Sequence, residues 1–108
     1  MMFQLTSNFV VLALFASAAQ SAYLGCFSSS TNLSFKEHDV YQSLGQCQQV
    51  CKAANLPILA TTKGTDCFCG AEAPPQSDAV ADSSCNTPCS GYAEDKCGGE
   101  GFFSVSSL

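Results

Sequence analysis

The spacing of eight cysteines constrains the fold of this 108-residue chain more than any other feature. The stretch "CQQVC" places two of them four residues apart at 47–51, and "DCFCG" places two more two residues apart at 66–70. Four residues is the repeat of one helical face, and two is the repeat of one strand face. The spacings therefore allow a metal site, a redox pair, or a helix joined to a strand by disulfides. The full set is Cys26, Cys47, Cys51, Cys67, Cys69, Cys85, Cys89 and Cys97.

Residues 1–21 are typical of a secretory signal peptide. An unbroken apolar run at 9–16 is followed by small residues that suit cleavage before Ala22, although an earlier cut after Ala19 would also fit. The apolar run is shorter than the roughly 20 residues that a bilayer-spanning helix needs. We therefore expect residues 22–108 to form one secreted domain with no transmembrane anchor in the mature chain.

The composition of this domain favours disulfides over the other two interpretations. Secretion exposes thiols to an oxidising compartment, and neither a Cys-x-x-Cys redox motif nor paired zinc knuckles occur. Four disulfides at ~2–4 kcal/mol each would stabilise a domain too small to bury a large core. We expect no bound metal. The net charge of −5 and the lack of a basic cluster disfavour nucleic acid as a partner.

A helix is predicted at 43–55. Ser43 is a candidate N-cap with Gln46 as its reciprocal partner, while Asn55 and Pro57 provide the stop signal. Four residues recur at helical spacing and would form the buried face, namely Leu44, Cys47, Cys51 and Ala54. Both thiols of "CQQVC" are then expected to point inward.

Short strands are predicted on either side of this helix, at 22–27, 57–62, 66–70 and 102–105, with a turn at 63–65. The polar segment at 28–38 is expected to be a loop, and 71–84 is expected to be an irregular surface loop without core residues. In the first strand we expect Tyr23 and Phe27 in the core. Of the adjacent Phe102 and Phe103, one should be a core residue. Cys67 and Cys69 should share one strand face, which suits disulfides to the helix, but spacing alone leaves the partners open.

The order of the motifs "YLGCF", "CQQVC", "DCFCG", "CNTPCSG" and "CGG" resembles that of WSC domains. These are cysteine-rich modules of fungal cell-wall stress sensors and of some secreted fungal enzymes, and the resemblance extends over 23–105. It implies an α+β fold of the disulfide-rich PAN or apple type, with one main helix packed on a short antiparallel sheet. It also implies the pairs Cys26–Cys85, Cys47–Cys67, Cys51–Cys69 and Cys89–Cys97. Two departures are Ser28, where the family commonly has an acidic residue, and Ser106, where it has a terminal Tyr.

The resemblance further implies a carbohydrate-binding module for cell-wall polysaccharide of the β-glucan, chitin or xylan type, acting outside the cell or at its wall. Sugar rings stack on exposed aromatic rings, and their hydroxyls need polar partners. Tyr92, in "SGYAEDK", is the first candidate for stacking, and the alternative is a core role. Tyr41 is the second, and the alternative is a hydrophobic staple to the helix start. Candidate hydroxyl partners are Asn86, Glu94 and Asp95.

Other functional classes have weaker support in the sequence. No motif selects a catalytic carboxylate pair or nucleophile, so we expect that the protein is not an enzyme. We also expect no cofactor and a monomeric state. A secreted protein-binding effector on the same scaffold is the alternative function, because fold alone does not decide function. His38 is interpreted as a solvated loop residue, with weak metal binding as the alternative. Asn32 begins the sequon Asn-Leu-Ser and is a candidate glycosylation site.

Overall fold

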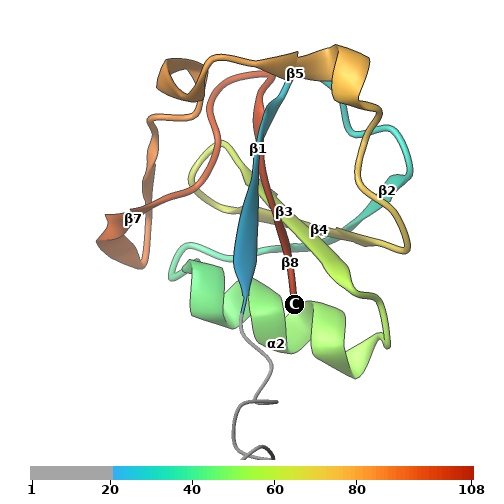
Figure 1. The fold of residues 1–108 in the computed structure, drawn as a ribbon. Helices are drawn as coiled ribbons and strands as arrows, with labels where there is room; N and C mark the ends of the chain where they lie inside the picture. Colours follow the sequence, from blue (N-terminus) through green and yellow to red (C-terminus); the bar gives the residue numbers. More distant parts are fainter. Residues whose placement is uncertain (1–20) are drawn as a thin grey trace, which may run out of the picture.

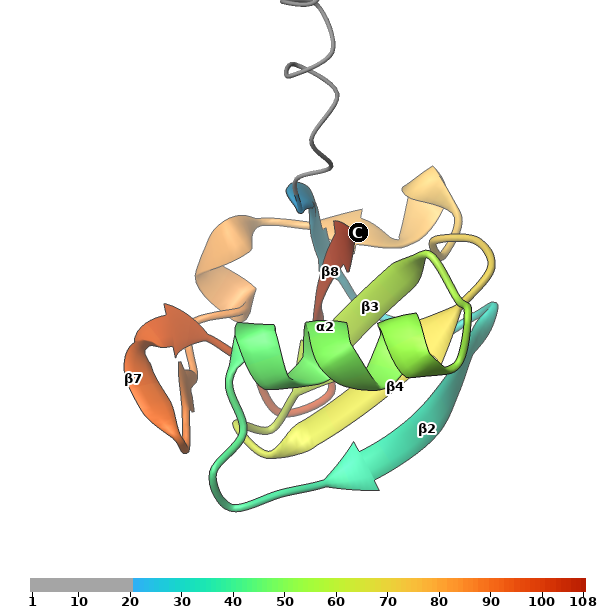
Figure 2. The ribbon, with the colours of Figure 1, turned by 90° about the horizontal axis from the view of Figure 1, so that it is seen from below.

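The computed structural model describes residues 21–108, so all but the last residue of the predicted signal peptide lies outside the described part. Six strands form one antiparallel sheet in the order β2-β4-β3-β8-β1-β5, and β6 pairs with β7 in a separate hairpin (Figure 1). The helix α2, Leu44–Ala53, crosses one face of the sheet over β3 and β4 (Figure 2). The strands are β1 Ala22–Phe27, β2 Leu33–His38, β3 Ile58–Thr62, β4 Asp66–Gly70, β5 Ala79–Val80, β6 Pro88–Cys89, β7 Tyr92–Lys96 and β8 Phe103–Ser107. The predicted α+β class, with one main helix on an antiparallel sheet, is confirmed.

The helix begins and ends where local sequence signals place it. Ser43 is extended and its hydroxyl accepts a hydrogen bond from the Gln46 backbone N–H at 3.0 Å. Ala54 closes the last turn, and Asn55 adopts a left-handed φ of 61° that takes the chain out of the helix. The predicted reciprocal bond from Gln46 to the cap does not form. Its side-chain amide instead donates to Glu37 Oε2 at 3.0 Å, a hydrogen bond to a charged acceptor.

Cystines form the core on the helix-covered face of the sheet. Cys47–Cys67 and Cys51–Cys69 join α2 to β4 with Cα–Cα separations of 5.5 Å and 5.4 Å. All four cysteines are buried around Leu59. Cys26–Cys85 and Cys89–Cys97 complete the four pairs that the family resemblance implies. The core on this face is thus held mainly by covalent bonds, as expected for so small a domain.

Aromatic and aliphatic side chains fill the opposite face. Phe27 and Val105 are fully buried there beside Ile58 and Ala60. The ring of Phe68, directed away from the helix, makes edge-to-face contacts with Phe35 and Phe103, at centroid distances of 5.6 Å and 5.2 Å. Phe103 packs against this cluster and is half-buried, so it is the one of the adjacent pair that contacts the core, while Phe102 is partly covered outside the cluster.

Three expectations about the flanking segments are wrong. The segment 28–38, which we predicted to be a loop, contains β2. Pairing with β4 holds this segment as a strand, although its mostly polar sequence does not indicate one. Tyr23 is 54% exposed, because the register of β1 shifts between Tyr23 and Gly25 and turns the ring outward. The loop at 71–84 contains β5 and two short 3₁₀ turns, and it buries Pro74.

Candidate functional site

The β6–β7 hairpin is attached to the start of α2 by three contacts. The Gly91 N–H donates to the Gln42 carbonyl oxygen at 2.7 Å, and the Leu44 N–H donates to Asp95 Oδ2 at 3.2 Å. The two backbones approach so closely that a Cβ on Gly91 would overlap the Tyr41 carbonyl. The Cys89–Cys97 disulfide closes the base of the hairpin. Residues 92–96 are therefore held at a fixed position beside the helix start.

A cavity of about 520 Å³ lies between this hairpin, the helix start and strands β1 and β8. Three predicted site residues, Asn86, Glu94 and Asp95, line this one cavity, although eight or more positions separate Asn86 from the other two. The remaining lining residues lie in or next to β1, β8, the helix start, β7 and the 3₁₀ turn at Asp82–Ser84, and they are Ser21, Tyr23, Leu44, Asp82, Cys85, Lys96, Ser104 and Ser106. The structure thus brings together the hydroxyl partners that the sequence predicts.

Two side chains at the sheet side of the cavity are fixed by hydrogen bonds. The Tyr23 hydroxyl donates to Asp82 Oδ1 at 2.8 Å. Partial burial, this hydrogen bond and the charge of Asp82 raise the pKa of Tyr23 to about 12. Tyr23 therefore stays protonated and a donor near neutral pH. Ser104 Oγ accepts from the Gly98 N–H at 2.9 Å.

The two predicted stacking residues lie outside the cavity lining, on neighbouring segments. Tyr92 is 51% exposed on β7, and its hydroxyl donates to Glu94 Oε1 at 2.9 Å. This hydrogen bond is the main reason that the pKa of Tyr92 is raised. Tyr41 is 79% exposed. Neither ring is a core residue, and Tyr41 is too exposed to staple the helix.

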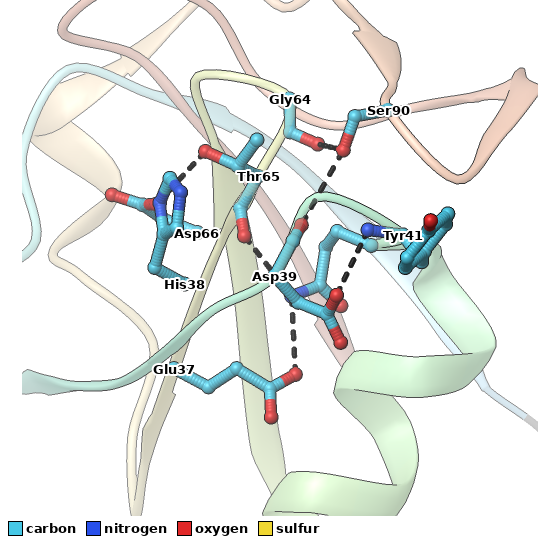
Figure 3. A network of polar contacts seen from close by, with 9 residues as sticks. Glu37, His38, Asp39, Tyr41, Gly64, Thr65, Asp66 and Ser90 are labelled. Atoms are coloured by element: carbon cyan, nitrogen blue, oxygen red, sulfur yellow. Dashed lines mark hydrogen bonds and ion pairs between the residues drawn. The ribbon is translucent and has the colours of Figure 1, made fainter.

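A polar network beneath Tyr41 fixes the segment that carries it. Glu37 Oε2 accepts from the side-chain amides of Gln42 and Gln46, at 3.3 Å and 3.0 Å. Asp39 Oδ1 accepts from the Tyr41 N–H at 2.8 Å. Figure 3 shows the ring of Tyr41 directed away from this network. The side chains of Glu37, Asp39 and Gln46 thus have partners within 37–46, whereas Gln42 Oε1 is buried with no partner in the described residues. The ring of Tyr41 is presented to solvent.

The same region contains the lone histidine. His38 ends β2 rather than lying in a loop, and its side chain is 61% exposed. Its Nδ1 lies 2.8 Å from Asp66 Oδ1, which also accepts from the Thr65 hydroxyl at 2.9 Å. Ser90 Oγ donates to the Gly64 carbonyl at 3.0 Å and links the hairpin to the β3–β4 turn (Figure 3). His38 thus has a hydrogen-bonding partner, Asp66, that the sequence did not predict.

Metal-ligating groups are sparse in the described residues. The sulfurs of Cys47, Cys51 and Cys67 lie within 4.8 Å of one another, and within 21–108 no other such group of three exists. Each of these sulfurs belongs to a disulfide and is not a thiolate, which is the form that binds metals. The cysteine geometry is thus that of crosslinks.

The candidate glycosylation residue lies on the surface of the domain. Asn32 is exposed in a left-handed turn with φ 73°, and its Nδ2 donates to the Ala73 carbonyl oxygen at 3.0 Å.

Between residues 21 and 108 no helix has the length and apolar character to cross a membrane.

Sequence reasoning missed the cavity residues of the sheet. Ser104 and Ser106 occupy alternate positions of β8 and line the cavity, while Val105 between them packs in the core of the opposite face. This period of two was visible in "SVS" and could have indicated a polar strand face. Tyr23 and Asp82 gave no local signal, because 59 positions separate them.

Comparison with known proteins identifies relatives with a shared domain. The family model of the WSC domain matches residues 23–99. Protein SLG1 of Saccharomyces cerevisiae is 36% identical over 100 residues, which are 91% of this chain and 26% of that protein. Cell wall integrity and stress response component 3 of the same yeast is 32% identical over 110 residues, covering 91% and 19%. Xylosyltransferase oxt of Drosophila melanogaster is 33% identical over 81 residues, covering 70% and 9%. The chain thus spans about a quarter or less of the length of these relatives.

Proposed function

The chain belongs to the WSC domain family, and on this premise we propose that it is a secreted binding module for cell-wall polysaccharide. The family model matches most of the chain, and a relative over 30% identical is named a cell wall integrity and stress response component. The printed name of that relative supports a wall-related role at the level of the family. Residues 22–108 would be the binding domain, and the substrate class would be β-glucan, chitin or xylan.

The observation that carries this proposal is the position of Tyr92 beside the cavity. Its exposed ring offers an apolar face, and its hydroxyl is bonded to Glu94, which lines the cavity together with Asn86 and Asp95. A polysaccharide needs both features, because sugar rings present an apolar C–H face and a rim of hydroxyls. Tyr41, on the segment that contacts the hairpin at Gly91, would extend the aromatic surface.

The proposal includes no chemical step. Glu94 and Asp95 each accept one hydrogen bond from the protein, and xylosyltransferase oxt shares with this chain only 9% of its own length. We therefore propose binding without turnover. The proposal also takes the domain to be a monomer and Asn32 to be its site of glycosylation.

Retention on insoluble polysaccharides tests this function. The purified residues 22–108 should be retained on at least one of chitin, β-glucan and xylan, with a Kd in the micromolar to millimolar range because a few stacked sugars give about −4 to −8 kcal/mol. Tyr92→Ala should weaken retention without lowering the melting temperature. Phe35→Ala is the matched control, because Phe35 is 53% exposed on β2, away from the hairpin. Retention lost equally in both variants would contradict the role of Tyr92. If no wall glycan retains the wild type, a protein ligand becomes the better hypothesis.

A further inference from the structure

We propose that the cavity beneath the hairpin accepts a sugar unit with a free amine, so that the domain prefers glycans containing non-acetylated hexosamine. This inference rests on the proposed function and specifies its ligand class. The volume of about 520 Å³ lies within the roughly 300–1,000 Å³ of small-molecule sites.

The cavity contains three carboxylates that are fixed in place and only partly satisfied. One oxygen of each accepts a hydrogen bond from the protein: Asp82 from the Tyr23 hydroxyl, Glu94 from the Tyr92 hydroxyl and Asp95 from the Leu44 N–H. The other oxygen of each makes no hydrogen bond to any residue in 21–108. The site therefore presents oriented acceptors to a ligand that donates hydrogen bonds.

A buried serine independently indicates that a polar ligand fits here. Ser106 is only 7% exposed, and it lines the cavity from the same face of β8 as Ser104. The hydroxyl of Ser104 accepts from Gly98, whereas that of Ser106 has no partner within the part of the chain that the structure describes. This hydroxyl is not enclosed by protein atoms, because the fully buried side-chain oxygens without a partner in 21–108 are Gln42 Oε1 and Thr61 Oγ1. It is open to the cavity and free to bond a ligand there.

Charge selects among the sugars that could enter. Three carboxylates face one ammonium, that of Lys96, and no ion pair joins Lys96 to them in residues 21–108. The cavity thus carries net negative charge and disfavours uronate or sulfated sugars. A protonated amine offers three donors and a positive charge, and charge-assisted hydrogen bonds are about twice as strong as neutral ones. An acetylated amine is neutral and retains one donor.

Calorimetric titration of residues 22–108 with three soluble oligosaccharides tests the preference. The probes are matched oligomers of glucosamine and N-acetylglucosamine, and a neutral β-glucan oligomer, at neutral pH and low salt. The glucosamine oligomer should bind at least about tenfold tighter than the other two. Raising the salt concentration should reduce this preference, because screening weakens interactions between partly exposed charges.

Two variants assign the preference to the cavity. Asp82→Asn keeps an oxygen acceptor for Tyr23 but removes one negative charge, and Ser106→Tyr fills the cavity; each should reduce glucosamine-oligomer affinity about tenfold or more. Glu72→Gln is the control, because it removes the same charge from an exposed residue outside the lining. If Ser106→Tyr does not fold by circular dichroism, Asp82→Asn decides.

The outcomes separate this inference from the proposed function. Equal affinity for the acetylated and free-amine oligomers overturns the inference, as does an equal loss in Glu72→Gln and Asp82→Asn. If insoluble wall glycan still retains the protein in those cases, the proposed function stands. If neither soluble oligomers nor insoluble glycans bind, both fail.

Discussion

The Asp95 carboxylate accepts a hydrogen bond from the backbone N–H of Leu44, 51 positions earlier in the sequence. Leu44 is the first residue of α2, and its N–H has no acceptor within the helix. The first turn contains no acidic residue of its own. Asp95 therefore supplies from β7 both an acceptor and a negative charge at the positive end of the helix dipole. One side chain thus attaches the candidate binding hairpin to the helix.

Removing this contact should destabilise the domain. We expect Asp95→Ala to lower the free energy of unfolding by about 1 kcal/mol, the usual cost of losing a capping acceptor. Asp95→Asn should lose less, because it retains an oxygen acceptor. The control is Glu94→Ala, whose hydrogen bond is with the exposed Tyr92, and its effect should stay below about 0.5 kcal/mol. Thermal melts followed by circular dichroism measure all three, and equal effects of the two alanine variants would contradict the capping role.

Reduction of the disulfides should unfold the domain. The helix is joined to the sheet by Cys47–Cys67 and Cys51–Cys69, and each crosslink contributes ~2–4 kcal/mol in a domain of this size. Non-reducing peptide mapping should find the four pairs and no free thiol. A melting curve unchanged by a strong reductant, with bond opening verified by mass spectrometry, would disprove this dependence. Detection of a Cys47–Cys51 bond would disprove the helix-to-strand pairing.

Local sequence signals predicted the helix and the central strands, but they failed at the sheet edge. Ser43 and the cysteine spacings carry information within a few residues, and the structure confirms the elements they indicate. β2 was missed because it is an edge strand with the sequence "LSFKEH", in which only Leu33 and Phe35 alternate with polar residues before the charged end of the strand. Its ladder with β4 provides the stabilisation that its composition does not signal.

The candidate site could be predicted only in part for a related reason. Glu94 and Asp95 were recognisable as polar residues next to an aromatic residue in a glycine-rich loop. The opposite wall is made by Tyr23, Asp82 and Ser106, which meet through the β1–β8 register and the Cys26–Cys85 disulfide. The "SVS" alternation could indicate that Ser106 lies on a polar strand face, but its meeting with Tyr23 and Asp82 depends on chain topology, which no local pattern encodes.

Alkaline pH should weaken the fold through Tyr23. Its pKa is about 12 in the folded state against an ordinary value of 10.0, so the folded protein holds this proton more tightly. The resulting stabilisation is complete below pH 10 and is lost as the pH rises through about 12. Because Tyr23 is 54% exposed, we expect its contribution to be below about 1 kcal/mol. Denaturant unfolding between these pH values should show a smaller loss for Tyr23→Phe than for the wild type. An identical pH dependence of the unfolding free energy in the two proteins would contradict this role of Tyr23.

Two adjacent threonines of β3 should respond oppositely to the same substitution. Thr61 is fully buried, and its hydroxyl has no hydrogen-bond partner in the described residues. Thr62 Oγ1 lies 2.9 Å and 2.8 Å from the carbonyl oxygens of Gly99 and Phe102. Thr61→Val should therefore raise the free energy of unfolding by up to about 1 kcal/mol, whereas Thr62→Val should lower it by about 1–2 kcal/mol. Chemical denaturation measures both, and destabilisation by Thr61→Val would show that its hydroxyl has a partner such as water.

The close approach of Gly91 to Tyr41 should be necessary for both stability and binding. The φ of Gly91 is not in the left-handed region, so the requirement for glycine is one of space, because a Cβ would meet the backbone of Tyr41. Gly91→Ala should displace the hairpin and lower the free energy of unfolding by about 1–3 kcal/mol. Retention on the best wall glycan should fall as well, because Tyr92 and Glu94 move with the hairpin. Gly45→Ala is the control: its Cβ would meet only Ser43 Oγ, at 3.9 Å, and the substitution should stabilise α2 by about 0.5–1 kcal/mol with retention unchanged. If Gly91→Ala left the melting temperature and the retention at wild-type values, the attachment of the hairpin to the helix start would not be what positions Tyr92.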